Sequence, residues 1–173
     1  MRYAIIGAGP AGVIAAETLR KTDPQGEVTL IGDEPEPPYS RMAIPYLLIE
    51  TISEQGTYLR KNPDHFRQQG IHVMQDRVTV VDAERQRLSL QSGGAVDYDR
   101  LLIATGSHPL EPLVPGVDLP GVHPCWTLAD ARQILTHAYP GAKVVLIGAG
   151  FIGCIVLESL VERGVELTVV EAK

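Results

Sequence analysis

The sequence has only two cysteines, and their spacing suggests neither redox nor metal chemistry. Cys125 and Cys154 lie far apart, so they form neither a disulfide framework nor a C-x-x-C pair. We expect two buried free thiols in a reducing compartment, which favours a cytoplasmic protein. The five histidines also show no spacing with cysteines or acids that is typical of a metal site.

Long apolar runs and an excess of positive charge are also missing. No apolar run approaches the roughly 20 residues that a membrane span needs, and Arg2 leads directly into a strand-like run rather than a signal peptide. The 15 Lys and Arg residues against 21 Asp and Glu residues give a formal net charge of −6. This balance argues against nucleic acid or a membrane as a partner.

The beginning of the chain has the pattern of a βαβ nucleotide-binding unit. A short apolar run, expected to be a buried strand, leads into the sequence G-A-G-P-A-G. A helix-like stretch and a second apolar run follow. The two strands and the helix are expected at residues 3–6, 28–31 and 13–21.

Each glycine of this run has a physical purpose in such a unit. Gly7 permits the tight turn, Gly9 lets the backbone approach a pyrophosphate, and Gly12 lets the helix pack close to the strand. Asp33 lies 21 residues after Gly12 (33 − 12), where an acid accepts hydrogen bonds from a ribose. A structural glycine turn is the alternative, but the strand, the helix and the acid together favour nucleotide binding.

The next segment is rich in proline and then apolar. Arg41 is either a solvated loop charge or an arginine folded onto a phosphate or flavin edge, which its planar fork suits. Residues 41–48 are expected to form a short helix or turn. A further helix is expected with Asn62 as N-cap, Pro63 at its first position and Gly70 at its end.

Four short β-like runs come next, and we expect them to form a small antiparallel excursion rather than another α/β repeat. Residues 92–94 (Ser-Gly-Gly) are the expected turn between the last two. A buried strand at 101–104 then leads into a proline-rich linker. The four runs are residues 71–74, 78–81, 87–90 and 96–98.

The end of the chain repeats the opening pattern. Apolar runs at 144–147 and 165–170 enclose the sequence G-A-G-F-I-G and a helix-like stretch. Glu171 directly follows the second of these runs. The pattern is that of a second nucleotide-binding unit.

Three motifs in this order resemble the FAD-dependent pyridine-nucleotide oxidoreductases, flavoprotein reductases with two dinucleotide folds. They are G-A-G-P-A-G, Y-D-R-L-L-I-A-T-G-S-H-P and I-G-A-G-F-I-G, while L-I-G-D-E-P-E-P-P-Y-S-R looks most like the branch with rubredoxin and ferredoxin reductases, NADH oxidases and the flavin half of nitrite reductase. The resemblance implies an α/β fold: a Rossmann-like FAD-binding domain with an antiparallel excursion, then the first βαβ unit of a Rossmann-like NAD(P)-binding domain. The implied segments are 1–112 (FAD domain, first segment), 113–140 (linker and helix) and 141–173 (start of the NAD(P) domain).

The resemblance also implies which residues bind the cofactors FAD and NAD(H). The first glycine loop would hold the FAD pyrophosphate, Asp33 the adenosine ribose, and the backbone of Val78 the adenine. The implied FAD-binding residues are Gly7, Gly9, Pro10, Ala11, Gly12, Asp33, Arg41, Val78, Ala104, Thr105, Gly106 and His108. The implied NAD(P)-binding residues are Gly148, Gly150, Phe151, Ile152, Gly153 and Glu171. Glu171, 18 residues after Gly153 (171 − 153), matches the ribose-binding acid of the family. An acid there repels a 2′-phosphate, so the resemblance implies NADH rather than NADPH. No catalytic side chain and no metal ligand is implied.

The sequence departs from the disulfide-reducing members of this family at one position. Those members carry a redox cysteine in a C-G-L-P-Y-like stretch, and Met42 stands there in the matching stretch M-A-I-P-Y. Methionine cannot form the thiolate that attacks a disulfide. We therefore expect no disulfide reduction and no cysteine-sulfenate chemistry.

The implied function is an FAD-dependent NAD(P)H oxidoreductase that takes hydride from NADH. Its electrons would pass to a separate acceptor: an iron–sulfur protein, oxygen or a small molecule. The alternative is a nucleotide-binding or assembly module without turnover of its own. We expect the 173-residue chain by itself to be inactive and to form a homo-oligomer through exposed edges of its second dinucleotide fold.

Overall fold

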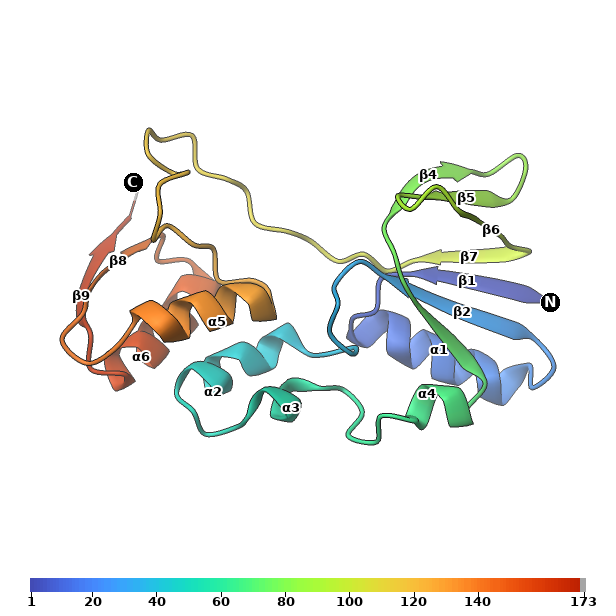
Figure 1. The fold of residues 1–173 in the computed structure, drawn as a ribbon, viewed down its shortest axis with the longest axis horizontal. Helices are drawn as coiled ribbons and strands as arrows, with labels where there is room; N and C mark the ends of the chain where they lie inside the picture. The colour runs from blue at the N-terminus through green and yellow to red at the C-terminus, as the bar shows by residue number, and fades with distance from the viewer. Residues whose placement is uncertain (172–173) are drawn as a thin grey trace. The chain divides into compact units, whose positions relative to one another are not determined.

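The computed structural model describes residues 1–171 and has two compact units. The first unit consists of Met1–Ser40 and Tyr58–Ser107. The second unit consists of Arg41–Thr57 and of the chain from His108 onward. Both units contain the βαβ pattern that the sequence predicts (Figure 1). The segments 1–112, 113–140 and 141–173 refer to cofactor domains, and they stay a prediction.

A four-stranded parallel sheet forms the centre of the first unit, with the strand order β3-β2-β1-β7. The innermost strands are β1 and β2, and Tyr3 of β1 pairs with Val28 on one side and with Arg100 on the other. The strands are β1 (Arg2–Ile6), β2 (Glu27–Gly32), β3 (Ile71–Gln75) and β7 (Arg100–Ile103).

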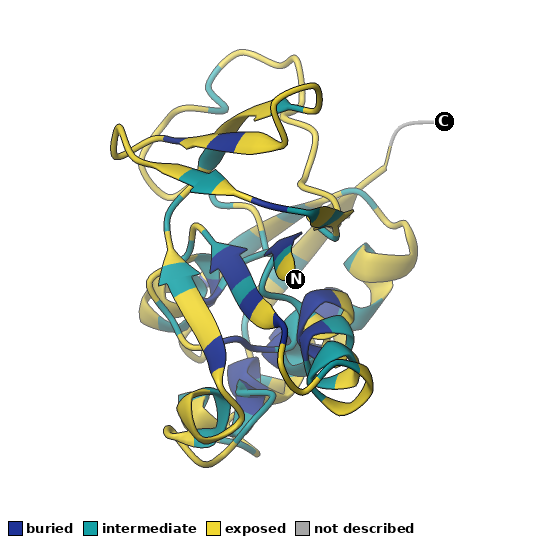
Figure 2. Cartoon of the chain, turned by 90° about the vertical axis from the view of Figure 1, so that its right-hand side faces the viewer, coloured by how far each residue is buried: buried dark blue, intermediate teal, exposed yellow. Residues whose placement is uncertain are grey.

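Other elements pack on both faces of the centre of this sheet. Helix α1 (Pro10–Thr22) and the short α4 (His65–Gln68) lie on one face, and a three-stranded antiparallel sheet lies on the other (Figure 1). Because side chains alternate along a strand, Ile5 packs toward the helices while its neighbour Ala4 packs toward the antiparallel sheet. Figure 2 shows buried positions along the central strands. The antiparallel strands are β4 (Val78–Asp82), β5 (Arg87–Leu90) and β6 (Ala95–Asp97).

The predicted turn at residues 92–94 is confirmed, since Gly93 has a φ of +89° and Leu90 N donates to Gly94 O at 2.9 Å. The prediction for residues 71–74 is wrong. They form β3, which pairs in parallel with β2 through Val28 and Ile71. A short apolar run gives no information on strand direction, and the long return from β2 makes the parallel pairing possible.

Two further predictions in the first unit need correction. The strand at 101–104 is not buried: Ile103 of β7 is 61% exposed, because β7 lies at an end of the sheet order. The helix expected from Asn62 begins instead after Asp64. Asn62 forms the preceding turn, in which its Oδ1 accepts from the backbone nitrogen of Asp64 at 3.0 Å.

The second unit has a two-stranded parallel sheet, with α6 packed against one of its faces. Ala138, Val156 and Leu160 are the buried centre of this packing. Its elements are the 3₁₀ turn η1 (Arg41–Ala43), α2 (Ile44–Leu48), α3 (Glu54–Thr57), α5 (Leu128–His137), β8 (Lys143–Ile147), α6 (Phe151–Glu162) and β9 (Glu166–Val170).

Helix α2 packs on α5 and α6, although about 80 residues or more separate it from them in the sequence. The guanidinium of Arg163, just after α6, is nearly buried and stabilises the packing of α2 on α5 and α6. It donates to the carbonyl oxygens of Leu48 at 2.6 Å and of Ala138 at 2.7 Å. The ends of α2 and α5, whose last carbonyls have no partner within their own helices, are thus bound by one side chain.

The prediction of two buried thiols is wrong for Cys154, which is exposed on α6. Cys125 is partly buried, and this burial raises the pKa of its thiol to about 11 because it disfavours the thiolate. Within residues 1–171, no helix has the length and apolar character to cross a membrane.

Candidate functional site

The loop between β1 and α1 is fixed by two glycines that leave no room for a side chain. Gly7 has a φ of +112°, and its backbone nitrogen donates to Ile31 O at 2.7 Å. A Cβ atom at Gly12 would overlap the carbonyl oxygen of Gly7. Helix α1 therefore starts in direct contact with the turn, as the sequence predicts for a nucleotide loop.

The outer side of this loop leaves open space, and the positive end of α1 there favours an anion. A Cβ atom at Gly9 would meet nothing within 4 Å. Helix α1 begins with Pro10 and has no acidic residue in its first turn, so its positive end is not neutralised locally. Amides of the first turn have no partner within a helix and can bind phosphate oxygens. The loop thus fits the pyrophosphate of a dinucleotide.

The end of β2 lies against the same loop. A Cβ atom at Gly32 would lie 2.8 Å from the Cβ of Ala8, so the next residue, Asp33, is held beside the turn. Arg77 donates to Asp33 Oδ2 from Nη2 at 2.7 Å and from Nε at 3.1 Å. The pair borders an open polar hollow of about 510 Å³, lined by Asp33, Gln75, Asp76, Arg77, Gln91 and Ser92.

The motif Y-D-R-L-L-I-A-T-G-S-H-P contacts the same loop. Ala104 follows β7, and its backbone nitrogen donates to Ile6 O at 2.7 Å. A Cβ atom at Gly7 would overlap the carbonyl oxygen of Ala104 and would lie 3.0 Å from the nitrogen of Thr105. The structure therefore brings the glycine loop, the end of β2 and Ala104–Thr105 together in the first unit.

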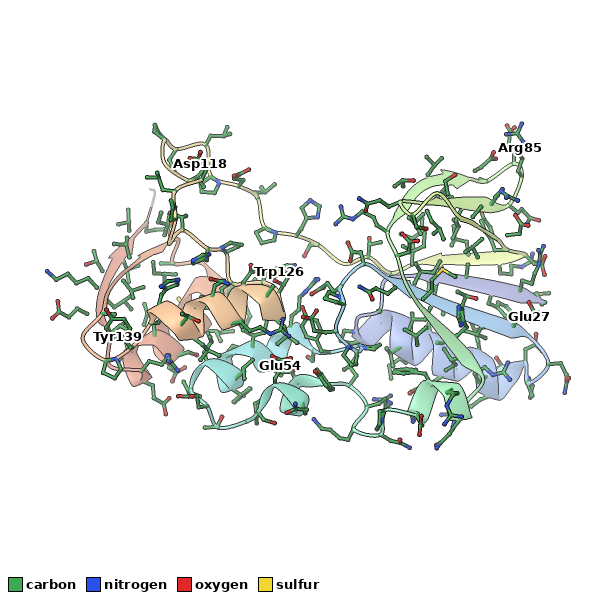
Figure 3. All side chains as sticks on the ribbon, viewed as in Figure 1. Glu27, Glu54, Arg85, Asp118, Trp126 and Tyr139 are labelled. Carbon is green, nitrogen blue, oxygen red and sulfur yellow. The ribbon has the colours of Figure 1, made fainter. Side chains whose placement is uncertain are left out.

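Two residues of the implied FAD site, Arg41 and His108, lie in the second unit. Arg41 is half-buried, with its guanidinium carbon 5.1 Å from the centre of the Trp126 ring, a cation–π arrangement. Figure 3 labels Trp126 just before α5. Arg41 is therefore not the solvated loop charge that the sequence left open, and its approach to a cofactor stays a prediction.

The loop between β8 and α6 repeats the geometry of the first loop. Gly148 has a φ of +96°, and its nitrogen donates to Val170 O at 2.8 Å. A Cβ atom at Gly153 would overlap the carbonyl oxygen of Gly148, and one at Gly150 would meet nothing within 4 Å. Helix α6 also has no acidic residue in its first turn, and Phe151 at its start is exposed. The second loop therefore also suits a pyrophosphate.

The acid of the second unit has a different partner from the acid of the first. The carboxylate of Glu171 accepts a hydrogen bond from the backbone nitrogen of Ala149, inside the glycine loop. Asp33, by contrast, accepts from the side chain of Arg77. Both acids nevertheless stand at the end of the strand next to their loop.

Sequence reasoning missed Arg77 and the residues that support it. Asp76 Oδ2 lies 2.5 Å from the hydroxyl of Ser92, and this hydrogen bond lowers the pKa of Asp76. The available signal was the position of Arg77 directly before Val78, which the family resemblance places at the adenine. Within residues 1–171, no three histidine, cysteine or acidic side chains gather as a metal site would require.

A parallel-sheet unit and a second βαβ unit, each with a glycine loop and an acid, define a protein with two dinucleotide-binding folds. The chain belongs to the pyridine nucleotide-disulphide oxidoreductase family, whose model matches residues 1–173.

The comparisons with known proteins agree on this family. The chain is 35% identical to a rhodocoxin reductase of Rhodococcus erythropolis over 173 residues, covering 99% of this chain and 40% of the relative. It is 38% identical to a probable ferredoxin reductase of Castellaniella defragrans, covering 98% of this chain and 42% of the relative. Among solved structures, the ferredoxin reductase of the CYP199A2 system of Rhodopseudomonas palustris matches 97% of this chain and 42% of its own, with 32% identity and a TM-score of 0.89.

The chain thus spans about two fifths of the length of the relatives it matches. The likeness covers nearly all of this chain, including both glycine loops. It confirms the predicted α/β fold and the family resemblance that the three motifs suggested.

Proposed function

We propose that the protein is an FAD-dependent NADH oxidoreductase that passes electrons to a separate acceptor. FAD would bind at the first glycine loop and NADH at the second. When bound, the two cofactors supply hydride transfer and electron release, so the protein contributes binding and orientation. No side chain of the described residues is needed as an acid or base for that chemistry.

The observation that carries the proposal is the repetition of one geometry in one chain. In each unit the third glycine of the loop touches the carbonyl of the first glycine, and the second glycine faces open space. In each unit an acid stands at the end of the following strand, Asp33 in the first and Glu171 in the second. Two such sites are what a protein needs to bring two dinucleotides together.

The roles of the chain's own residues follow from this geometry. The first-turn amides of α1 would bind the FAD pyrophosphate at Gly9–Gly12, and Asp33 would accept from the adenosine ribose. Ala104 and Thr105 would form a wall of the site next to Gly7. In the second unit, Gly150–Gly153 would hold the pyrophosphate of NADH.

A preference for NADH over NADPH is part of the proposal. Glu171 places a carboxylate at the second loop, beside the Ala149 amide. A 2′-phosphate brought to this carboxylate would meet like charge, whereas ribose hydroxyls can donate to it.

The acceptor that fits best is a ferredoxin-type iron–sulfur protein. This part of the proposal rests on the relatives, a rhodocoxin reductase and two ferredoxin reductases, which match nearly the whole of this chain. Oxygen or a small acceptor would be the other destinations. A cytoplasmic location is also proposed, on the basis of the two unpaired cysteines.

The test is an absorbance spectrum of the purified whole protein, followed by anaerobic titration with NADH, because the 173-residue chain by itself is expected to be inactive. We expect a flavin spectrum that NADH bleaches and that returns when an oxidised ferredoxin is added. Bound FAD that NADH does not bleach would favour the alternative, a nucleotide-binding module without turnover. A protein that binds neither FAD nor NADH would refute the proposal.

Self-association of the second unit is a further part of the proposal. Val145 and Ile147 of β8 are each 61% exposed, so one face of the two-stranded sheet is apolar and uncovered within the described residues. Exposed apolar strand faces favour association. Light scattering would test this, and a monomer at all concentrations would contradict it.

A further inference from the structure

Arg77 lies where the chain passes from the parallel sheet to the antiparallel sheet. Directly before it, Asp76 extends the pairing of β3 with β2, since its nitrogen donates to Gly32 O at 2.9 Å. The nitrogen of Arg77 donates to Asp76 Oδ1 at 2.8 Å, and its carbonyl accepts from Gln91 N at 2.8 Å. The backbone of Arg77 is therefore held on both sides.

From this fixed backbone, the side chain of Arg77 extends to Asp33. Its Nε and Nη2 both donate to Oδ2 of Asp33, which leaves Oδ1 outside the pair. Oδ1 keeps lone pairs that can accept from a hydroxyl group. The guanidinium thus fixes the direction of the carboxylate without using its whole acceptor capacity.

The other charged and polar groups around this pair do not compete for the guanidinium. The carboxylate of Asp76 is occupied by the hydroxyl of Ser92 at 2.5 Å and by the backbone nitrogen of Arg77. The remaining side chains that line the hollow, Gln75 and Gln91, carry no charge. Asp33 and Arg77 therefore form one oriented ion pair at the edge of a polar hollow.

We propose that Arg77 is a positioning residue that orients Asp33 for the ribose hydroxyls of the adenosine half of FAD. This inference rests on the proposed FAD site, and it adds a residue to which neither the sequence motifs nor the family match gives a role. An arginine near a ribose acid can also serve a 2′-phosphate. Here Nε and Nη2 both donate to Asp33, so we assign Arg77 to the acid rather than to a 2′-phosphate.

The ion pair is partly exposed, with 64% of the Arg77 side chain and 45% of the Asp33 side chain accessible. Exposed pairs contribute little to stability. Loss of Arg77 should therefore affect the direction of Asp33, and with it ligand discrimination, more than it affects folding. A loss of ligand discrimination without a loss of stability therefore indicates a positioning role rather than a structural one.

The experiment measures by calorimetry how the full chain, freed of FAD, binds ADP and 2′,3′-dideoxy-ADP. We expect the unmodified protein to prefer ADP about tenfold. Arg77→Met should reduce this preference to about threefold or less, and Arg77→Lys should restore part of it. FMN, which lacks the adenosine half, should bind equally to all variants.

Arg87→Met is the matched control. Arg87 forms a comparably exposed pair with Asp97 at 2.9 Å in the antiparallel sheet. This variant should keep the preference of the unmodified protein. Circular dichroism checks that each variant is folded. If Arg77→Met is not folded, Arg77→Gln is measured in its place.

The outcomes separate this inference from the proposed function. An unchanged preference for ADP in folded Arg77→Met or Arg77→Gln overturns the positioning role but leaves the FAD site intact. Equal binding of ADP and 2′,3′-dideoxy-ADP by the unmodified protein also overturns the positioning role and leaves the FAD site intact. Failure of the unmodified protein to bind FAD or ADP overturns both.

Discussion

The carboxylate of Glu171 accepts a hydrogen bond from the backbone nitrogen of Ala149, so the acid that follows β9 is bound to the glycine loop of its own unit. A ribose hydroxyl entering this site would donate to the same carboxylate. That Glu171 faces the adenosine ribose of NADH stays a prediction, which the following variant tests.

In the whole protein, we expect Glu171→Arg to shift the preference from NADH toward NADPH. The substitution removes a charge that repels the 2′-phosphate and adds one that can pair with it, a change of about 1–3 kcal/mol. Steady-state kcat/KM with both nucleotides measures the effect. Glu166→Arg, at the exposed start of β9, is the control with the same charge change. Equal selectivity in both variants would show that Glu171 does not face the ribose.

We expect Gly12→Ala to abolish tight FAD binding. The new Cβ would overlap the carbonyl of Gly7, so the start of α1 must move away from the loop. Such overpacking costs about 1–3 kcal/mol of folding stability. FAD content after purification and thermal unfolding measure the two effects. Gly94→Ala is the control, because its Cβ would meet only ordinary contacts at 3.5 Å or more. Full FAD content in Gly12→Ala would contradict the loop assignment.

We expect the protein not to reduce disulfides such as coenzyme A disulfide. Met42, which the family resemblance places at the redox cysteine, is 68% exposed and has no thiol to attack a disulfide. The release of thiols under NADH measures this activity. The test should include a variant with Cys125 and Cys154 replaced by serine. NADH-driven thiol release by that variant would show that the chemistry does not need the missing cysteine.

The ion pair of Glu17 with Arg60 should make stability depend on pH in the acid range. Arg60 donates twice to the Glu17 carboxylate, at 2.6 Å each, and these bonds lower the pKa of Glu17 from its ordinary value of 4.5. The contribution is therefore complete above pH 4.5 and disappears as the pH falls through the lowered pKa.

Arg60→Met should accordingly cost about 1–2 kcal/mol at neutral pH and almost nothing in strong acid. Urea unfolding at several pH values measures this difference. Arg85→Met, at the exposed turn between β4 and β5 (labelled in Figure 3), is the control and should change little at any pH. A cost for Arg60→Met that does not vary with pH would mean that Arg60 acts by packing rather than by charge.

Replacing Arg163 with methionine should destabilise the second unit by about 2–3 kcal/mol, because the carbonyls of Leu48 and Ala138 would lose a charged donor. Hydrogen exchange of α2 measures the local effect. Arg163→Lys should retain part of the protection. If α2 is equally protected in all three proteins, packing rather than Arg163 holds it.

Much of the first site could be predicted from the sequence, because glycine spacing and apolar periodicity are local signals. β1, α1 and β2 appear where residues 3–6, 13–21 and 28–31 predict them. Gly7 and Gly12 are needed by the backbone itself, so their identity reveals the geometry.

The remaining features depend on contacts between distant residues. The direction of β3 is set by pairing with β2, about 40 residues earlier, and not by its own apolar run. Arg77 meets Asp33 across 44 residues, through a crossover that no motif describes. Similarly, nothing in the composition of residues 41–57 indicates that they pack with α5 and α6 rather than with the first unit.

The placement of α2 in the second unit has a consequence for synthesis on the ribosome. Leu48 and Arg163, which are joined by a hydrogen bond, are 115 residues apart. At about 5–20 residues per second, α2 leaves the ribosome roughly 6–23 s before Arg163. Until α5 and α6 are synthesised, Ile44, Leu47 and Leu48, all buried in the folded chain, lack the two helices that pack on α2. The nascent chain therefore presents a short apolar segment for chaperones to bind while the first unit is already able to fold.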